Sequence, residues 1–282
     1  MPAARVPAVL SIAGSDSGGG AGIQADLKAF ARCGVHGMTA ITAVTAQSTV
    51  GVEAIHPIPP EMIVAQVRAV AEDIGVDAVK IGMLGTADTV RAVREALAYT
   101  GGAPVVIDPV MVAESGAVLL DDAARRAIVT ELLPLAAVIT PNLPEARVLA
   151  GDGEEVPEEL ARALHALGPA AVVVTGGHRD AATDVFFDGR ELHEIPGRRH
   201  ADGAAHGSGC THSSALAAHL ALGLEPLEAA RAAREIAGAA VRDGLRSIGA
   251  GAGPVDVFDL TSAAQRRALG APGGSPAAGH VT

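Results

Sequence analysis

The chain has 282 residues, a formal net charge of −11, 49% hydrophobic residues and only 2% aromatic residues. This acidic composition lacks the basic surface and the stacking rings of nucleic-acid-binding proteins, and no apolar run approaches the roughly 20 residues of a membrane span. Its two cysteines, Cys33 and Cys210, fit neither a disulfide framework nor a zinc pattern, and the short apolar stretch near Met1 is no signal peptide, so we expect a cytoplasmic protein.

The first element is a buried strand over residues 8–13, followed by a glycine-rich loop over residues 14–20 and a helix over residues 22–33. Dinucleotide-binding folds also begin with a strand, a glycine loop and a helix. Their fingerprint requires an acidic residue about 20 positions further on to hold a ribose, and none stands between Asp26 and Glu53. The sequence therefore disfavours dinucleotide binding.

Asp26 lies at the margin of the apolar stripe of this helix, which Ile23, Leu27 and Phe30 form. A carboxylate in that position needs a partner. It makes either an ordinary ion pair at the helix surface or a hydrogen bond to a substrate in a pocket. The adjacent glycine loop favours the pocket.

Residues 37–46 are rich in β-branched side chains and predict a strand that ends at Gln47, with a second short strand over residues 52–56. Gln47 then lies either in a solvated turn or where its amide recognises the edge of a ring. Because residues 36–58 interrupt the alternation of strands and helices, they are expected to form a small β lid or a sheet edge at which two subunits meet.

The rest of the chain alternates between helices and strands. Helices are predicted over residues 60–74, 87–99, 157–167 and 225–243, and strands over 77–82 and 171–175, within 105–111 and 138–145, and in a hairpin over 184–195. Strands that recur every 25 to 35 residues, roughly, indicate a parallel sheet with helices on both faces. We therefore predict a three-layer α/β fold in one domain over residues 1–269, with a disordered tail over residues 270–282.

Asp108, Asn142 and Glu145 each follow a predicted strand. In a parallel sheet, ligands bind at the carboxyl ends of the strands, so these three side chains are expected to converge there. Carboxylate and amide oxygens suit Mg²⁺, which keeps several waters and bridges phosphates. Helix capping is the alternative for Asp108 and Asn142, and Asn142 and Glu145 have the spacing of a capping arrangement.

A loop with two glycines, Gly207 and Gly209, runs directly into a helix-forming segment that extends to about Ala221. The first N–H groups of a helix have no intrahelical partner, and together with the helix dipole they predict an anion site. Cys210 stands at this helix start, where the pKa of a thiol is lowered and the thiolate can act as a base. An anion site beside a base suits phosphoryl transfer, although a small buried cysteine remains the alternative. Neither lysine of the chain follows a glycine, so a Walker-type phosphate loop is absent.

Six segments together resemble the hydroxymethylpyrimidine/phosphomethylpyrimidine kinase family of thiamine biosynthesis, within the ribokinase-like superfamily. These segments are residues 12–28 (IAGSDSGGGAGIQADLK), 44–47 (VTAQ), 80–84 (KIGML), 108–111 (DPVM), 140–146 (TPNLPEA) and 206–211 (HGSGCT). The resemblance extends from about residue 8 to residue 258 and implies a ribokinase-like fold.

The resemblance also implies roles for individual residues. The pyrimidine contacts it implies are Gly14, Asp26, Gln47 and Met83, and the anion hole is Gly207, Ser208 and Gly209. The residues implied for ATP and its phosphates are Asn142, Thr175, Gly177 and Arg234, and those for Mg²⁺ are Asp108 and Glu145. Cys210 is implied as the base that takes the proton of the substrate hydroxyl.

The expected reaction is ATP- and Mg²⁺-dependent phosphorylation of 4-amino-5-hydroxymethyl-2-methylpyrimidine, and then of its monophosphate, by a homodimer that binds no nucleic acid and no membrane. One alternative is a pyridoxal or pyridoxine kinase of the same superfamily, because that ring also carries a hydroxymethyl group beside a hydrogen-bonding edge. A regulator that binds nucleotide without catalysis is a third possibility. The complete set of Asp108, Asn142, Glu145 and Cys210 argues against it.

Overall fold

The protein is described here by a computed structural model that covers residues 5–151, 156–176, 182–200 and 204–263. Within these ranges the chain forms a nine-stranded sheet in the order β3-β2-β1-β4-β5-β6-β7-β8-β9. The strands are β1 (Ala8–Asp16), β2 (His36–Gln47), β3 (Val52–Pro57), β4 (Ala78–Ile81), β5 (Val105–Ile107), β6 (Val138–Ile139), β7 (Ala171–Val174), β8 (Asp184–Phe187) and β9 (Leu192–Ile195).

The centre of the sheet is parallel and its two margins are antiparallel. β1 pairs in parallel with β2 on one side and with β4 on the other, and the parallel pairing continues from β4 through β7. β3, β8 and β9 add antiparallel pairs at the margins. Because the chain moves outward from β1 in both directions, the strand order reverses between β1 and β4, and open α/β sheets bind ligands at such a point.

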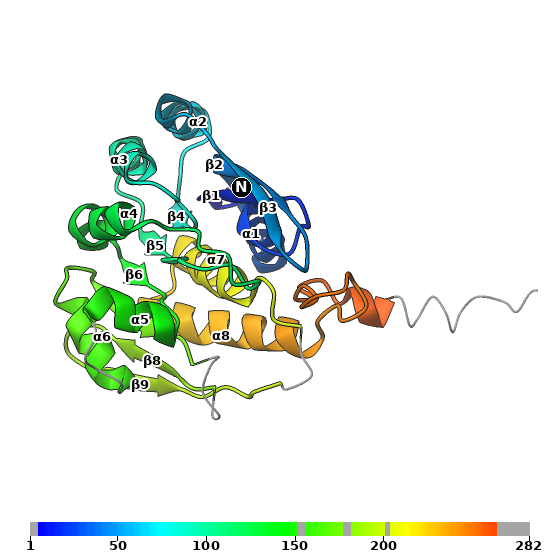
Figure 1. Cartoon of the computed structure of the whole chain (residues 1–282). Helices are drawn as coiled ribbons and strands as arrows, with labels where there is room; N and C mark the ends of the chain where they lie inside the picture. The colour runs from blue at the N-terminus through cyan, green and yellow to red at the C-terminus, as the bar shows by residue number, and fades with distance from the viewer. Residues whose placement is uncertain (1–4, 152–155, 177–181, 201–203, 264–282) are drawn as a thin grey trace, which may run out of the picture.

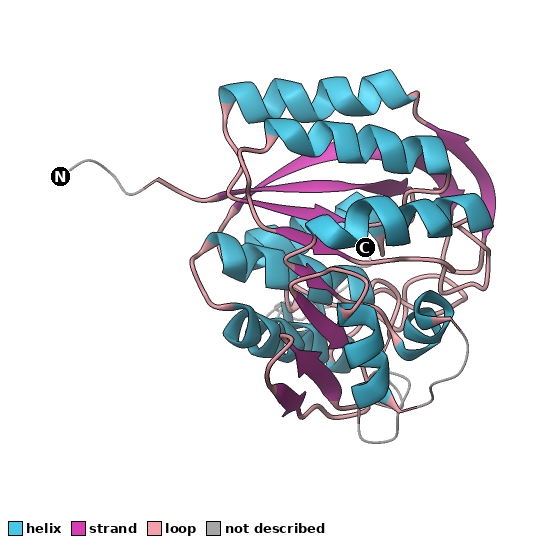
Figure 2. Cartoon of the chain, turned by 90° about the vertical axis from the view of Figure 1, so that its left-hand side faces the viewer, coloured by secondary structure: helices cyan, strands magenta, loops and turns pink. Residues whose placement is uncertain are grey.

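Two helical layers cover the sheet (Figures 1 and 2). One layer contains α2 (Pro60–Asp73), α3 (Ala87–Ala96), α4 (Asp122–Ala127), α5 (Leu143–Ala150) and α6 (Pro157–His165). The other contains α1 (Gly22–Cys33), α7 (Ser208–Ala221) and α8 (Pro226–Arg242). Both faces of the strands are therefore buried, which explains why their sequences are nearly continuous apolar runs.

Alternate residues of one strand point to these two layers. Leu10 and Ile12 of β1 belong to the core beneath α2–α6, whereas Val9 packs in the second core with Phe30 of α1. This side-chain period of two fixes the register of β1, because a shift by one residue would exchange the two faces.

The predicted three-layer α/β arrangement is confirmed, and several element boundaries differ. The sequence missed α4, which Asp121 caps, and the π-helical and 3-10 turns of residues 128–135 that follow it. It also missed α5 as a helix, although it identified the capping residues that begin it. α3 ends at Ala96 and continues only as a 3-10 turn, so the predicted helix over residues 87–99 was too long.

No helix in the described part of the chain has the length and apolar character needed to cross a membrane. Residues 270–282 lie outside the described residues. The disordered tail, the domain end at residue 269 and the cytoplasmic location stay predictions.

Candidate active site

A cavity of about 540 Å³ opens at the carboxyl ends of the central strands, beside the point where the strand order reverses. Most of the residues that the sequence nominated line it: Gly14, Gln47, Met83, Asp108, Asn142, Glu145, Thr175, Gly207, Ser208, Gly209, Cys210 and Arg234. Gly177 lies outside the described residues. Asp26 is the exception, because it is fully buried and does not line the cavity.

Asp26 lies within the protein, where it accepts hydrogen bonds from three side chains. Ser11 and Ser214 donate to it at 2.6 and 2.7 Å, and Lys80 Nζ lies 2.9 Å from its Oδ1. These contacts occupy the carboxylate, so the prediction that Asp26 contacts the substrate does not fit the geometry. The side of α1 that carries Asp26 packs against α7 and the sheet, not against the cavity. The sequence of one helix does not show which element packs on each of its faces.

Lys80 provides the buried positive charge of the site. Its Nζ is fully buried, 2.9 Å from Asp26 and 3.9 Å from Asp108. Burial would lower the pKa of Lys80, but the carboxylates of Asp26 and Asp108 and the nearby Cys210 outweigh it and hold that pKa above its ordinary value. Lys80 therefore remains charged beneath the cavity floor.

The predicted anion site lies where the glycine turn meets α7. Gly207 is the N-cap residue with φ of 83°, a conformation that favours glycine, and α7 begins at Ser208. A Cβ atom on Gly207 would also overlap the carbonyl oxygen of Gly20 in the first loop. Both constraints bring the N-terminus of α7 close to the glycine loop after β1. The N–H of Ser208 already donates to the carbonyl oxygen of Ala205 at 2.9 Å, so the N–H groups that follow it in the first turn are the ones that can receive an anion.

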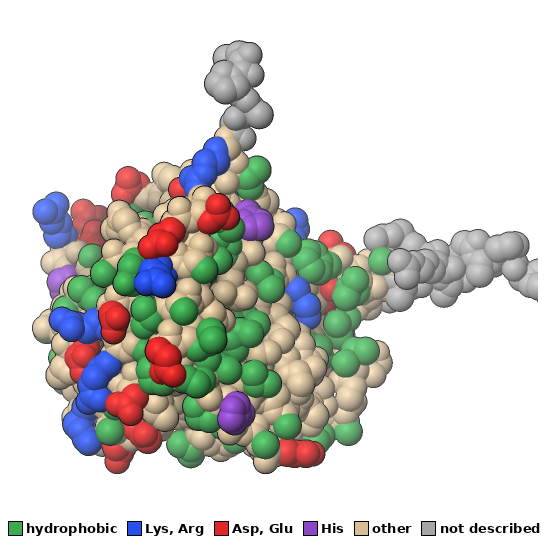
Figure 3. All heavy atoms as spheres, turned by 90° about the horizontal axis from the view of Figure 1, so that it is seen from above, with side chains coloured by type: hydrophobic (Ala, Val, Ile, Leu, Met, Phe, Trp, Pro, Cys, Tyr) green, Lys and Arg blue, Asp and Glu red, His purple; other side chains and the backbone are tan. Residues whose placement is uncertain are grey.

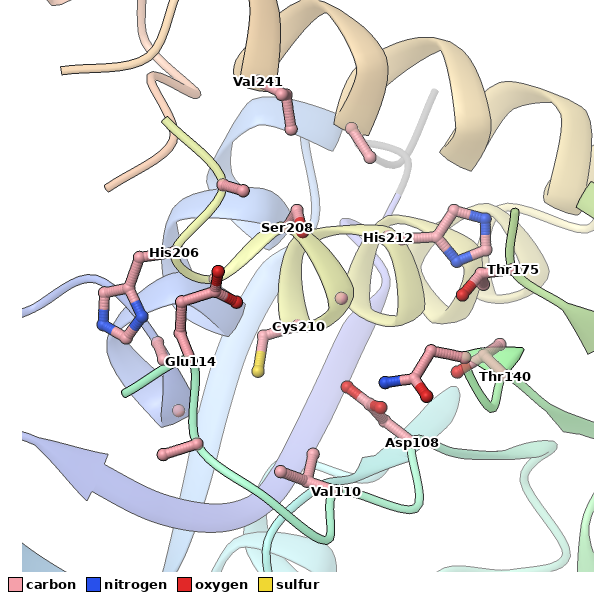
Figure 4. A pocket seen from close by; sticks show the side chains of 18 of the residues that line it. Asp108, Val110, Glu114, Thr140, Thr175, His206, Ser208, Cys210, His212 and Val241 are labelled. Atoms are coloured by element: carbon pink, nitrogen blue, oxygen red, sulfur yellow. The ribbon is translucent and has the colours of Figure 1, made fainter. Parts of the chain in front are cut away.

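Cys210 points from the first turn of α7 into the cavity, toward the side from which Asp108 projects (Figure 4). Desolvation raises the pKa of its half-buried thiol to about 12; Lys80 acts against this increase, and Asp108 and Asp26 add to it. The expectation that the helix start lowers this pKa was therefore wrong for the ligand-free cavity. The dipole effect is smaller than the loss of water around the sulfur, and burial could not be read from the sequence.

Asn142 and Glu145 form a capping box at the start of α5, as their spacing allowed. The backbone N–H of Glu145 donates to Asn142 Oδ1 and the backbone N–H of Asn142 donates to Glu145 Oε2, both at 2.9 Å. Both residues nevertheless line the cavity with Asp108. Capping and ligand binding are thus compatible here, since the box fixes the direction of the carboxylate.

Two carboxylates meet at this end of the cavity, and the pKa of each is raised above its ordinary value. Burial and then Asp108 raise the pKa of Glu145 to about 8. Burial also raises the pKa of Asp108, against Lys80 and the Ser213 hydroxyl, which donates to Asp108 at 3.0 Å. Two desolvated carboxylates that disfavour each other's charge are suited to a hard cation.

The donor set fits Mg²⁺ only in part. In the residues that the structure describes, no group of three or more His, Cys, Asp or Glu side chains could hold a metal alone. Mg²⁺ needs fewer protein ligands, because it keeps waters and takes phosphate oxygens. Asp108 and Glu145 therefore fit as its two protein ligands when a nucleotide is present.

Arg234 lines the cavity, and protein groups already engage it. Its guanidinium donates to the carbonyl oxygen of Ala182 and lies 3.7 Å from Asp184 at the start of β8. Asp184 also accepts from the backbone N–H of Gly176 at 2.7 Å. Arg234 thus supports the strand ends beside Thr175, and its predicted contact with a phosphate stays a prediction.

The opposite end of the cavity is lined by Gly14, Thr45, Gln47 and Met83. A Cβ atom on Gly14 would lie 2.9 Å from Met83 Cε, so only glycine leaves Met83 in its place. Thr45 donates from its hydroxyl to Gln47 Oε1 at 3.2 Å. Glu114 reaches into the cavity from the loop after β5 (Figure 4), which puts a further carboxylate near the start of α7.

Sequence reasoning missed three residues that organise this site: Lys80, Asp16 and His206. Lys80 had a readable signal, because a lysine inside the apolar strand segment AVKI must have a buried counter-charge. Asp16 and His206 are 190 positions apart, yet His206 Nε2 lies 3.0 Å from Asp16 Oδ2. No local pattern indicates such a pair.

A family model described as phosphomethylpyrimidine kinase matches residues 16–256. The chain belongs to the phosphomethylpyrimidine kinase family. A hydroxymethylpyrimidine/phosphomethylpyrimidine kinase from Rhizobium meliloti (strain 1021) is 49% identical over 257 residues, which span 88% of this chain and 96% of that protein. As a member of the family, this chain is a kinase, that is, a transferase of phosphoryl groups.

Solved structures show the same fold. The pyridoxal kinase from Staphylococcus aureus in complex with pyridoxal has a TM-score of 0.83 and 33% identity, covering 91% of this chain and 95% of that one. The phosphomethylpyrimidine kinase from Clostridium difficile 630 has a TM-score of 0.72 and 38% identity, covering 82% and 97%. The family and the ribokinase-like fold predicted from the sequence are thereby confirmed.

Replacing Lys80 with Met should destabilise the protein by about 3–5 kcal/mol, because it leaves the Asp26 carboxylate buried without its cation. Arg91→Met is a matched control, since the ion pair of Arg91 with Asp88 lies on the surface and should contribute less than about 1 kcal/mol. Urea unfolding measures both free energies. Equal losses in the two variants would contradict this assignment.

Replacing Glu145 with Gln should remove a pH-dependent loss of stability from the metal-free protein. The pKa of Glu145 is raised from 4.5 to about 8 in the fold, so its stabilising contribution is complete below pH 4.5 and disappears as the pH rises through 8. Near pH 5 the two proteins should be similar, and at pH 8.5 the variant should be more stable, by on the order of 2 kcal/mol.

The measurement is urea unfolding at both pH values in the presence of a chelator. Glutamine keeps an oxygen that can accept from the backbone N–H of Asn142, so the capping box is retained. Glu159→Gln, on the exposed face of α6, is the control. Parallel stability curves for wild type and Glu145→Gln would refute the prediction.

Proposed function

We propose that this chain uses MgATP to phosphorylate 4-amino-5-hydroxymethyl-2-methylpyrimidine to its monophosphate and then to the diphosphate, as an enzyme of thiamine biosynthesis. The observation that carries the proposal is one cavity, in a chain of this family, that joins an anion site and a cysteine to a wall of Gly14, Gln47 and Met83. The names of the relatives support the same reaction.

The acceptor ring is proposed to lie against Gly14, Gln47 and Met83. An apolar wall with one amide suits a flat heteroaromatic ring, because the thioether packs on its face and the amide bonds its edge. The hydroxymethyl group of that ring then points toward Cys210 and the start of α7. This arrangement aligns the acceptor oxygen with a phosphate held by Gly207, Ser208 and Gly209.

ATP is proposed to occupy the other end of the cavity, beside Asn142, Thr175 and Arg234. The staphylococcal pyridoxal kinase of the same fold has been solved with ADP and with AMP-PCP, which supports a nucleotide donor. Gly177, the remaining residue nominated for this role, lies outside the described residues. When bound by Asp108 and Glu145, Mg²⁺ would neutralise negative charge on the phosphates.

Cys210 is proposed to accept the proton of the substrate hydroxyl. Its thiol is protonated in this structure, because burial, Asp108 and Asp26 oppose the thiolate more strongly than Lys80 and the backbone N–H of Gly22 favour it. Neutralisation of Asp108 would leave Lys80 as the dominant charge beside the sulfur and would favour the thiolate. The base would therefore become competent only in the loaded site.

The second phosphorylation needs less from this base. Its acceptor is a phosphate oxygen, which is already largely ionised near neutral pH because the second pKa of a phosphate monoester is about 6. What the second step requires is charge screening and alignment, which the turn at Gly207 and the carboxylate-bound cation would supply.

Phosphorylation of pyridoxal is the second candidate. The observation that favours it is the TM-score of 0.83 with the staphylococcal pyridoxal kinase, compared with 0.72 for the clostridial phosphomethylpyrimidine kinase. Overall shape does not select the acceptor ring, however, and the relatives that match most of this chain are named as pyrimidine kinases.

A homodimer is proposed from the exposed apolar surface around the edge strand β3. The face seen in Figure 3 carries a field of hydrophobic side chains, and Val44, Ile55 and Met62, from β2, β3 and α2, are 45%, 41% and 53% exposed. An edge strand with apolar residues favours association unless it is covered. Light scattering should then give twice the mass of one chain.

The experiment that tests the function measures ADP release from MgATP with hydroxymethylpyrimidine, its monophosphate and pyridoxal in parallel. Turnover of both pyrimidines with slow turnover of pyridoxal would support the proposal. Turnover of pyridoxal alone would transfer the function to the second candidate, and no turnover with any ring would favour a nucleotide-binding regulator.

Replacing Cys210 with Ala should slow the first phosphorylation by about 100-fold or more and the second by less than about tenfold, because only the first acceptor must lose a proton. Single-turnover assays with each acceptor measure the two rates. Cys33→Ala, which removes the other cysteine, outside the cavity, should leave both rates unchanged. Equal losses in the two steps would argue against a base at this position.

A further inference from the structure

Asp16 joins the first glycine loop to the anion site. Its carboxylate accepts hydrogen bonds from the backbone N–H groups of Gly18, Gly20 and Ala21 at 2.7, 3.0 and 2.8 Å. Its fourth partner is His206 Nε2, 3.0 Å from Oδ2. Although burial would raise the pKa of Asp16, His206 and the loop N–H groups lower it below its ordinary value, so the carboxylate is ionised and the imidazole nitrogen is the donor.

His206 immediately precedes the turn that begins α7. Both partners are nearly inaccessible, with side chains 8% and 3% exposed. The imidazole packs so closely on Gly20 that a Cβ atom there would overlap the ring, and Gly207 touches the carbonyl oxygen of Gly20 in the same way. The glycine loop of residues 14–20, here called the acceptor loop, is therefore in direct contact with the turn of residues 205–207 before α7, here called the anion turn. Among the described side-chain contacts, the hydrogen bond between His206 and Asp16 is the one that links them.

The backbone of His206 is also bonded to the C-terminal segment. Its N–H donates to the carbonyl oxygen of Gly253 at 3.3 Å, and the N–H of Val255 donates to its carbonyl oxygen at 3.1 Å. The N–H of Gly251 in turn donates to the Thr49 hydroxyl at 3.2 Å, beside the turn that follows Gln47.

The first loop reaches the same turn from the other side. The Ser17 hydroxyl donates to the carbonyl oxygen of Gln47 at 2.7 Å and accepts from its N–H at 2.9 Å. The contacts form a closed circuit around the acceptor end of the cavity, from Asp16 through Gln47, Thr49 and Gly253 to His206 and back.

We propose that His206 is a positioning residue for phosphoryl transfer: its hydrogen bond to Asp16 closes this circuit and keeps the acceptor loop in register with the anion site. The inference rests on the proposed function. It concerns alignment, because His206 acts through the loop and the turn that it joins, and not through contact with the transferred group.

Loss of the hydrogen bond between His206 and Asp16 should therefore affect the rate of turnover and leave substrate binding nearly unchanged. Each substrate would still bind in its own half of the site, because the residues proposed to contact the ring and those at the start of α7 all remain present. The acceptor oxygen and the phosphorus would no longer be held in line, and small misplacements of reacting atoms have large effects on rate. Loss of the bond should thus reduce kcat and leave KM values nearly unchanged.

The test compares His206→Gln with His206→Asn. The amide nitrogen of glutamine lies the same number of bonds from Cα as Nε2 of histidine and can restore the donor to Asp16, whereas the shorter asparagine cannot reach it. For His206→Asn we expect kcat to fall by about 30- to 100-fold, with KM for ATP and for the acceptor within about threefold of wild type. His206→Gln should recover kcat to within about fivefold of wild type.

Two controls separate positioning from loss of structure. His219→Asn removes another imidazole of α7 that bonds within its own helix, and it should leave kcat unchanged. Titration of His206→Asn with ADP should give near wild-type affinity, which shows that its nucleotide end is folded.

Equal kcat values in the asparagine and glutamine variants, or a loss confined to KM or to ADP affinity, would overturn the inference. If His206→Asn does not fold, the glutamine variant alone still decides it, because kcat below one tenth of wild type would overturn it. The wild-type assay tests the proposed function separately: the ratios between variants apply to whichever ring the enzyme phosphorylates.

Discussion

The ion pair of Lys80 with Asp26 is the interaction on which the site depends. Both side chains are fully buried, so neither charge can exist there without the other. Asp26 comes from α1, Lys80 from β4, and Ser214, which also donates to Asp26, from α7. One carboxylate thereby ties the strand next to the switch point to α1 and α7, two of the helices that line the cavity, and it holds a cation near Cys210 and Asp108.

The fold converts this interaction into a site by bringing distant segments to one edge of the sheet. β1 and β4 lie side by side in the sheet, although α1, the β2–β3 pair and α2 separate them along the chain. The chain leaves the carboxyl ends of β1 and β4 in different directions, and the cavity lies between the two loops that follow. α7 then crosses beneath this gap and brings Ser208, Gly209 and Cys210 to the cavity, so these proposed site residues are positioned by a rigid element.

The sequence predicted those parts of the molecule that depend on local patterns. The helix over residues 22–33, the layer arrangement, the Asn142–Glu145 box and most cavity residues follow from periodicity, spacing and family motifs. It did not predict the direction of Asp26, because a helical wheel shows which residues share a face but not what packs on that face. It gave the wrong direction for the pKa of Cys210, since desolvation is a property of the assembled cavity.

Charge neutralisation is therefore the quantity that decides what this cavity can do. Its wall contains the carboxylates of Asp16, Asp108, Glu114, Glu145 and Asp184, and the cations Lys80, Arg198, Arg199 and Arg234. Lys80 is engaged by Asp26 and Asp108, and Arg234 by Asp184. A triphosphate would enter a cavity in which Lys80 and Arg234 are already paired, and the Glu114 carboxylate would oppose it. On the proposed function, binding of the nucleotide and of a cation at Asp108 and Glu145 would then be mutually dependent, and the second phosphorylation, with an anionic acceptor, would depend on that cation more strongly than the first.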